Sequence, residues 1–311
     1  FESADTLEAK LLAGHSGYDL VVPSASLLGR HIAAGFYLPL DKNKLPNIKH
    51  MQKDIMATAS TQDANNKHAM PYLWGTVGIG YNVEMVQKAL GKDAPVDSWD
   101  LVFKPENMKK LASCGVNFLD TAGEIYPLAL NYVGKDSNSK KTSHYKKNSD
   151  AAKMLKSIRP YVNQFNSSSY INNLASGSIC VAVGYSGDVL QAKARAEEAG
   201  NGINIEYTIP KEGTAVWIDV LAIPSDAKNP GAAHKFLNFL MRPDIIADVT
   251  NYVTYANANA SATRLQDPAV SNNPAIYPNA KIMERLFTAD EVPNKITKMM
   301  TRFWTNMKTA R

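Results

Sequence analysis

Short apolar runs alternate along the chain with segments in which apolar residues recur every three or four positions. The runs are typical of buried strands, and the spaced segments are typical of helices with one apolar face. The predicted strands span 18–23, 77–81, 115–120, 179–184, 203–210 and 216–224. The predicted helices span about 83–90, 124–133, 151–158, 188–200, 230–240 and 293–308. Such alternation predicts an α/β protein with largely parallel sheets.

The chain has 311 residues, of which 45% are hydrophobic and 20% charged, so it can bury a large core and favours two lobes over one. The β-rich passages near 70–82 and 200–224 are the predicted crossings between the lobes. The 34 Lys and Arg residues exceed the 29 Asp and Glu residues, but the excess is scattered. Its densest run, Lys140 to Lys147, predicts a solvated loop and no nucleic-acid surface. No apolar run approaches the roughly 18 residues of a membrane span.

Motifs for catalysis, nucleotide binding and metal binding are missing from the sequence. The six histidines never fall at metal-ligand spacing, and neither the P-loop nor the dinucleotide-binding glycine pattern occurs. The segment Gly184 to Gly187 is one residue short of the nucleophile elbow G-x-S-x-G. We therefore expect no enzyme activity, no metal and no cofactor.

One carboxylate lies inside an apolar strand. Asp219 belongs to the run Val216 to Pro224, and Trp217 lies two positions before it, on the same face of a strand. A buried charge without a partner is costly, so Asp219 needs a cation from the protein or from a ligand. A carboxylate beside an aromatic ring suits an alkylammonium group. The alternative is an aspartate that only holds a loop through backbone hydrogen bonds.

Other candidate ligand groups follow the ends of predicted strands, where an α/β protein presents its binding site. They are Ser24, Glu124, Tyr185, Asp188 and Tyr255. Each also has a structural interpretation: the serine and the aspartate as helix caps, the glutamate as a complement to a helix dipole, and the tyrosines as packed side chains. The recurrence of acidic and aromatic residues at successive strand ends favours a site for a cation.

The two cysteines, Cys114 and Cys180, each stand beside a predicted strand. If those strands are neighbours, a disulfide can form. Closing such a loop is worth about 4 kcal/mol in the chain-entropy treatment. Two reduced thiols in the core are the alternative.

Seven short motifs carry a resemblance to a known family. They are YDLVVPS at 18–24, PYLWGT at 71–76, GIGYN at 78–82, PVDSW at 95–99, GYSGD at 184–188, IPKEG at 209–213 and YANAN at 255–259. Together with the pairs Trp217-x-Asp219 and Tyr185-x-x-Asp188, they make the chain similar to the periplasmic polyamine-binding proteins. These are the spermidine and putrescine receptors of bacterial ABC importers, and the match covers essentially the whole chain.

The resemblance implies an α/β fold of the two-lobed periplasmic solute-binding type (type II). Each lobe would be a mixed sheet flanked by helices, with the ligand cleft between the lobes. Lobe 1 would comprise 1–73 plus about 201–246, and lobe 2 about 74–200 plus 247–311. The family begins with a strand and an aromatic-acidic segment of the pocket. Because this sequence starts after that segment, we expect lobe 1 to lack the family's first strand.

The resemblance also implies the roles of the candidate residues. The groups that would receive the ligand's ammonium and amine hydrogens are Glu124, Asp188, Asp219 and Ser24. The aromatic walls around its methylene chain would be Tyr185, Trp217 and Tyr255. A Trp at position 217 goes more with spermidine than with putrescine in this family, so spermidine is the expected ligand and putrescine the next.

The implied partners are a polyamine, an ABC permease and its ATPase, and the implied location is the periplasm, with the receptor acting as a monomer. Exported proteins keep disulfides, which favours a bridge between Cys114 and Cys180. One alternative is a receptor for another organic cation such as agmatine. The alternative from a different class is a glycoside hydrolase in which Glu124 and either Asp188 or Asp219 form the carboxylate pair.

Overall fold

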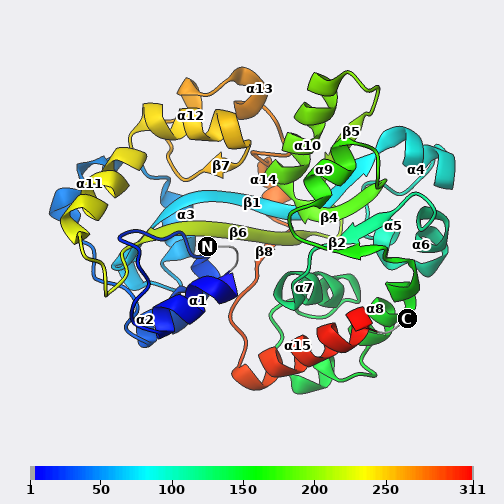
Figure 1. Ribbon diagram of the computed structural model, residues 1–311, viewed down its shortest axis with the longest axis horizontal. Coiled ribbons are helices and arrows are strands. Elements are labelled where there is room, and N and C mark those ends of the chain that lie inside the picture. Colours follow the sequence, from blue (N-terminus) through cyan, green and yellow to red (C-terminus); the bar gives the residue numbers. More distant parts are fainter. Residues whose placement is uncertain (1–3, 310–311) are drawn as a thin grey trace. The chain divides into compact units, whose positions relative to one another are not determined.

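A computed structural model describes residues 4–309 of the chain. The chain divides into two compact units. Unit 1 consists of Phe1–Gly75 and Trp217–Asn273, and unit 2 consists of Thr76–Val216 and Pro274–Arg311. The chain passes from one unit to the other within β1 (Ala69–Asn82), within β6 (Thr214–Ala222) and again after Asn273 (Figure 1).

The first predicted boundary lies within two residues of the observed one, but two predicted ranges differ. Residues 201–216 belong to unit 2 because β5 (Ile205–Thr208) pairs with the second half of β1. Residues 247–273 belong to unit 1 because β7 (Ala256–Asn257) pairs with Leu73 and Trp74 in the first half of β1. In both cases a strand distant in sequence decides the unit.

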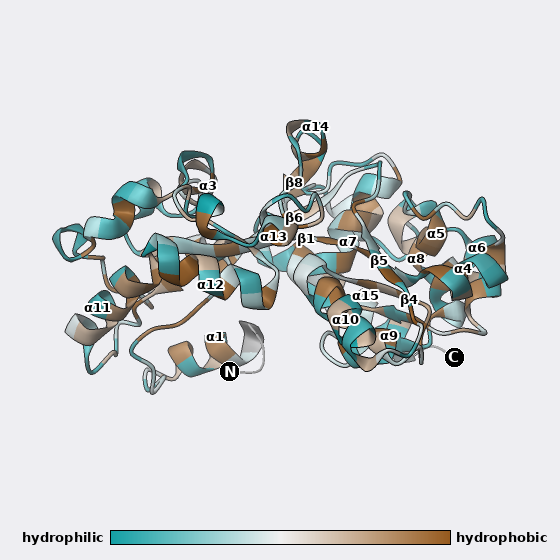
Figure 2. Cartoon of the chain, turned by 90° about the horizontal axis from the view of Figure 1, so that it is seen from above, coloured by the Kyte–Doolittle hydropathy of each residue, from teal (hydrophilic) through white to brown (hydrophobic). Residues whose placement is uncertain are grey.

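Unit 1 contains six α-helices in its described part. They are α1 (Ala4–Leu12), α2 (Leu28–Ala33), α3 (Lys53–Ala59), α11 (Pro230–Leu240), α12 (Pro243–Val253) and α13 (Pro268–Ser271). Figure 2 shows apolar and polar colours on the same helix in α11 and α12, as expected of helices that bury one face. From α12, Ile246 and Ala247 pack with Ala262 against Tyr72 and Leu73 of β1.

The predicted strand at 18–23 does not form a ladder. Val21 instead makes a single antiparallel bridge to Ala222, and Ser24 makes another to Asp219. The backbone N–H of Val220 also donates to the carbonyl of Pro23, at 2.9 Å between N and O. The segment therefore follows β6 closely without continuous strand pairing.

Unit 2 contains the remaining described helices and most of the strands. Its helices are α4 (Val83–Leu90), α5 (Asp100–Phe103), α6 (Pro105–Leu111), α7 (Ala122–Tyr132), α8 (Asp150–Ile158), α9 (Tyr170–Ala175), α10 (Ser186–Ala199), α14 (Ala280–Met283) and α15 (Asn294–Thr309). Its other strands are β2 (Val116–Phe118), β3 (Gln164–Phe165), β4 (Val181–Tyr185) and β8 (Leu286–Thr288).

The sheets are mixed, as the family resemblance implies, whereas the largely parallel sheets expected from the alternation of strands and helices are not found. The strand order β3-β2-β4-β1 has parallel β3-β2 and β2-β4 pairs and an antiparallel β4-β1 pair. β5 also pairs antiparallel with β1, whereas β6 and β8 are parallel. β4 and β5 both pair antiparallel with the second half of β1, because the chain runs in the opposite direction to β1 in each of these strands.

Helix ends follow the local signals of the sequence. The side chain of Asn82 accepts a hydrogen bond from the backbone N–H of Met85, which begins α4, and Gly91 ends that helix with φ at 90°. Gly200 ends α10 in the left-handed conformation, with φ at 59°. Because glycine adopts positive φ without steric cost, these two positions fix where the helices stop.

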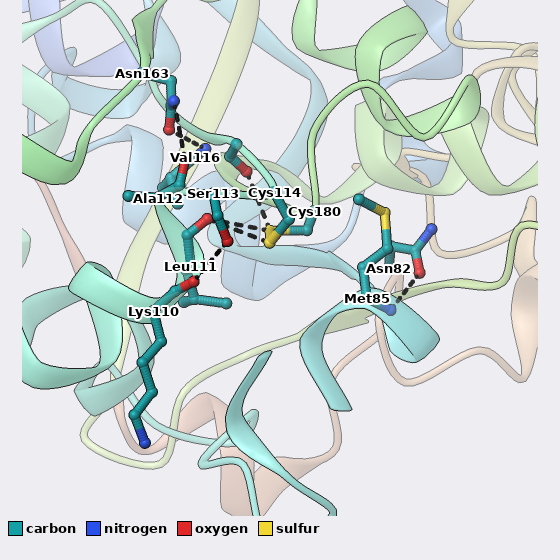
Figure 3. The surroundings of a disulfide bond; sticks show 11 residues. Asn82, Met85, Lys110, Leu111, Ala112, Ser113, Cys114, Val116, Asn163 and Cys180 are labelled. Atoms are coloured by element: carbon teal, nitrogen blue, oxygen red, sulfur yellow. Dashed lines mark hydrogen bonds between the residues drawn. A yellow bond between two sulfur atoms is a disulfide. The ribbon is translucent and has the colours of Figure 1, made fainter. Parts of the chain in front are cut away.

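The expected disulfide joins Cys114 and Cys180, with 5.4 Å between the two Cα atoms. Val116 of β2 lies opposite Val181 of β4, so the two strands are parallel neighbours. The bridge joins the residues just before these strands (Figure 3). Gly115, with φ at 93°, brings the chain from the bridge into β2. The neighbouring strands that the sequence required for a disulfide are therefore present.

Within residues 4–309, no helix is both long and apolar enough to cross a membrane. In the same range, no three His, Cys, Asp or Glu side chains gather as a metal site would require.

Candidate functional site

In unit 1, alternation along β6 separates its apolar side chains from the candidate ligand groups. Ile218 is 4% exposed and Val220 is fully buried. Trp217 and Asp219, at the positions between them, are both partly exposed. Successive side chains of a strand point to opposite faces, so the tryptophan and the aspartate share the accessible face of β6.

Two tyrosines stand beside this pair. The ring of Tyr255 meets the ring of Trp217 edge to face, with 5.0 Å between the ring centroids and an interplanar angle of 76°. Burial, and then the negative charge of Asp219, raise the pKa of the Tyr72 hydroxyl, which places this side chain near the carboxylate. Tyr72 was not among the predicted site residues, because a tyrosine in a β-rich passage is usually packed in the core.

Ser24 belongs to the same cluster through its backbone. Its bridge to Asp219 sets the two residues opposite each other, and its Oγ lies 3.0 Å from the Oγ of Ser26. The side chain of Ser24 does not cap the short 3-10 helix η1 (Ala25–Leu27) that follows it. The capping interpretation therefore does not apply, and four predicted residues of unit 1 come together: Ser24, Trp217, Asp219 and Tyr255.

In unit 2, Tyr185 and Asp188 lie where β4 passes into α10. The hydroxyl of Tyr170 donates to Oδ2 of Asp188 at 2.8 Å and accepts from the backbone N–H of Tyr185 at 2.9 Å. Burial, and then the charge of Asp188, hold the pKa of Tyr170 well above its usual value, so the hydroxyl keeps its proton. Gly184 makes room for this ring, because a Cβ there would come within 2.5 Å of it. Tyr170 was missed because nothing in the sequence distinguishes it from a core tyrosine.

We expect Tyr170→Phe to lower the free energy of unfolding by about 1–3 kcal/mol, because it removes both hydrogen bonds from a fully buried site. Urea denaturation measures the change. Tyr252→Phe is the matched control, because it removes the same atom from a side chain that is 87% exposed. An equal effect of the two substitutions would contradict a bonded role for Tyr170.

Glu124 lies in the first turn of α7, two positions after its first residue. Its side chain has no hydrogen bond or ion pair with another described residue. Burial raises the pKa of its carboxyl from 4.5 to about 7. A partly accessible carboxyl whose pKa is raised by burial, and which has no cationic partner among the described residues, is the kind of group that a bound ammonium ion would stabilise in its charged form.

The topology relates Glu124 to Asp188. The first follows β2 and the second follows β4, and these strands are parallel neighbours. The carboxyl ends of parallel neighbours lie at the same edge of a sheet, so the helices that carry the two acids start from that edge. Each unit thus has a carboxylate near aromatic rings, Asp219 in unit 1 and Asp188 in unit 2, which is the chemistry of organic-cation binding.

Comparison with known proteins agrees with this chemistry. The sequence model of the family described as bacterial extracellular solute-binding protein matches residues 2–278. The chain belongs to this family. The putrescine-binding periplasmic protein SpuD of Pseudomonas aeruginosa (strain UCBPP-PA14) is 52% identical over 318 residues, covering 100% of this chain and 84% of that protein. The putrescine-binding periplasmic protein PotF of Escherichia coli (strain K12) is 50% identical over 311 residues, with the same two coverages.

A solved structure described as a putative spermidine/putrescine ABC transporter from Listeria monocytogenes has a TM-score of 0.88 and 30% identity to this solute-binding protein. The match covers 100% of this chain and 90% of that one. These findings confirm the predicted membership of the periplasmic polyamine-binding group and the type II solute-binding fold. The relatives are binding proteins and not enzymes, which rules out the glycoside hydrolase interpretation of Glu124, Asp188 and Asp219.

Proposed function

We propose that this solute-binding protein is a periplasmic receptor that binds a polyamine, putrescine in first place, and delivers it to an ABC permease and its ATPase for uptake. The observation that carries the proposal is the partly exposed pair of Trp217 and Asp219 on β6, with Tyr255 against the indole ring. An alkylammonium ion gains from a carboxylate and an aromatic ring together. We propose that the receptor acts as a monomer.

The seven predicted residues have distinct roles in this proposal. The carboxylates of Glu124, Asp188 and Asp219 receive ammonium groups, and Ser24 offers a neutral acceptor. The rings of Tyr185, Trp217 and Tyr255 cover the methylene chain. The partnerless carboxyl of Glu124 supports this assignment, and so does the hydroxyl of Tyr170, which orients Asp188.

The choice of putrescine rests on the relatives. The two at 52% and 50% identity are named for putrescine, whereas the one named for spermidine and putrescine in Escherichia coli is 33% identical. The expectation of spermidine, which rested on Trp217 alone, is therefore not retained. Agmatine is the second candidate, because a relative at 42% identity in Pseudomonas aeruginosa is named for putrescine and agmatine.

Thermal unfolding ranks these ligands. A ligand that binds only the folded protein raises its stability, by about 2.7 kcal/mol when present at 100 times its Kd. At equal concentrations we expect putrescine to raise Tm most, agmatine less and spermidine least. A larger rise in Tm with spermidine than with putrescine would make spermidine the preferred ligand. No rise in Tm with any of the three would contradict the proposed function.

We expect putrescine affinity to rise between pH 6 and pH 8, because the pKa of Glu124 near 7 makes its carboxyl ionise in this range. Amines of the ligand stay charged below about pH 10, so only the receptor changes. Below pH 7 the increase in putrescine affinity approaches about tenfold per pH unit. Calorimetric titrations at pH 6, 7 and 8 measure it.

Glu124→Gln should flatten this profile, whereas Glu106→Gln, at an exposed position of the same unit, should leave it unchanged. In the absence of ligand, the folding stability depends on pH with the opposite sign. The folded protein holds the proton more tightly than the unfolded chain, so the contribution of Glu124 to stability is complete below pH 4.5 and is lost as pH rises to about 7. Equal slopes in the two variants would show that Glu124 does not meet the ligand.

A further inference from the structure

The basic loop that the sequence predicts as merely solvated lines one side of a pocket in unit 2. The pocket has a volume of about 730 Å³. It lies between the segment after η5 (Thr142–Tyr145), the end of α8 and residues 299–307 of α15, a helix that packs against α7 and η5 (Figure 1). Its lining residues are Tyr145, Lys146, Lys147, Asn148, Lys156, Arg159, Pro160, Met299, Arg302, Phe303, Asn306 and Met307.

The charges on the lining have one sign. Five of its residues are Lys or Arg, and none is Asp or Glu. Lys146, Lys147 and Arg302 are exposed, and their side chains have no ion pair or hydrogen bond with a described residue. Three cations of the lining are therefore accessible to solvent and have no carboxylate partner among the described residues.

The other two cations are already engaged. Arg159 donates to the backbone carbonyls of Met307 and Lys308 near the end of α15, at 2.9 and 2.8 Å. Lys156 donates to the carbonyl of Lys147 at 2.8 Å, and its ammonium lies 5.7 Å from the ring centroid of Phe303. These bonds hold the walls of the pocket together and leave the three remaining cations available.

The inner wall is apolar. Tyr145, Phe303 and Met307 are 2%, 7% and 5% exposed, so they form the base of the pocket rather than protruding from it. Apolar walls, a few polar groups and a volume between about 300 and 1,000 Å³ are the usual properties of a site for a small molecule. A recessed apolar base also fits a small ligand better than a flat membrane surface.

We propose that this pocket binds a small organic anion with an aromatic or alkyl body. Its acid group would meet Lys146, Lys147 and Arg302, and its apolar body would pack on Phe303 and Met307. A polyamine is excluded as occupant because the lining would repel it. The pocket is thus a second site, independent of the proposed polyamine function.

The test uses 2-naphthalenesulfonate as the anion and 2-naphthol as its uncharged analogue, titrated calorimetrically into the whole chain. We expect saturable one-to-one binding of the sulfonate, at least about tenfold weaker binding of the naphthol, and weakening by salt, because the three cations are exposed. Added putrescine should not compete. Equal affinity for both probes, competition by putrescine, or no saturable binding in the millimolar range would overturn the proposal.

A pair of matched variants locates the site. Lys147→Gln with Arg302→Gln should weaken sulfonate binding by about tenfold or more, since two charged contacts are lost. Lys109→Gln with Lys110→Gln changes the net charge equally at exposed positions of α6 and should have no effect. Equal losses of sulfonate affinity in both variants would show that only net charge matters, and would overturn the assignment of the site to this pocket. Putrescine titrations of the same samples show separately whether the polyamine function holds.

Discussion

Asp219→Asn should weaken putrescine binding by on the order of 2–5 kcal/mol, the usual effect of removing one partner from a desolvated charge pair. The substitution keeps the shape of the side chain and removes only its charge. On β6 the carboxylate shares a face with Trp217 and lies opposite Ser24, and both neighbours remain in place. The ammonium ion would therefore lose its strongest contact in unit 1. Calorimetric titration measures the change.

Asp248→Asn is the matched control for this experiment. Asp248 is an exposed acid of the same unit, on α12, and its substitution makes the same change of charge. We expect the control to change putrescine binding much less than Asp219→Asn does, because solvent and salt screen an exposed charge that does not contact the ligand. Comparable losses in both variants would mean that the effect comes from the change of net charge and that the Asp219 carboxylate does not contact the ligand.

Replacing both cysteines with alanine should lower the free energy of unfolding by about 4 kcal/mol, because the bridge closes a loop of 66 residues in the unfolded chain. The bridged positions lie just before β2 and β4, and the helices carrying Glu124 and Asp188 follow these strands. Cys180 is fully buried, so alanine is preferred to serine there. Urea denaturation of the native protein and of the Cys114→Ala, Cys180→Ala variant gives the difference.

Reduction provides an internal control for the disulfide prediction. A thiol reductant should lower the stability of the native protein to about that of the double variant and leave the double variant unchanged. If the oxidised protein and the double variant unfold at the same urea concentration, the bridge contributes no stability. Putrescine affinity of the double variant, measured below its unfolding transition, shows whether the bridge also positions the acids of unit 2.

Local signals made the helices predictable. Asn82 and Gly91 delimit α4, and Gly200 ends α10, because capping side chains and positive φ act over a few residues. The predicted last helix, 293–308, differs by one residue at each end from α15. In these segments the sequence pattern and the tertiary structure agree.

Long-range pairing was less predictable. β5 and β7 join different units because each pairs with a different half of β1, and neither partner is adjacent in sequence. The same strand has antiparallel neighbours, whereas the alternation of strands and helices predicted parallel ones. At 18–23 an apolar run resembles a strand, yet it makes only single bridges. Apolar periodicity indicates burial and does not identify the pairing partner.

The candidate site, like the fold, could be predicted only in part from the sequence. Trp217 and Asp219 could be assigned to one face from strand alternation, and the partly exposed positions agree with that assignment. The supporting residues could not be found, because Tyr72 and Tyr170 are recognisable only by the carboxylates that they approach in the fold. A charged group in an apolar strand is visible in a sequence, whereas the neutral residue that orients it is not.

A calorimetric titration of the chain with putrescine at pH 7.5 and physiological salt tests the proposed polyamine site. We expect saturable binding with one putrescine per chain, release of protons on binding as Glu124 ionises, and a large loss of affinity in Asp219→Asn. Absence of binding, or unchanged binding by Asp219→Asn, would contradict the claim that these carboxylates form a polyamine site.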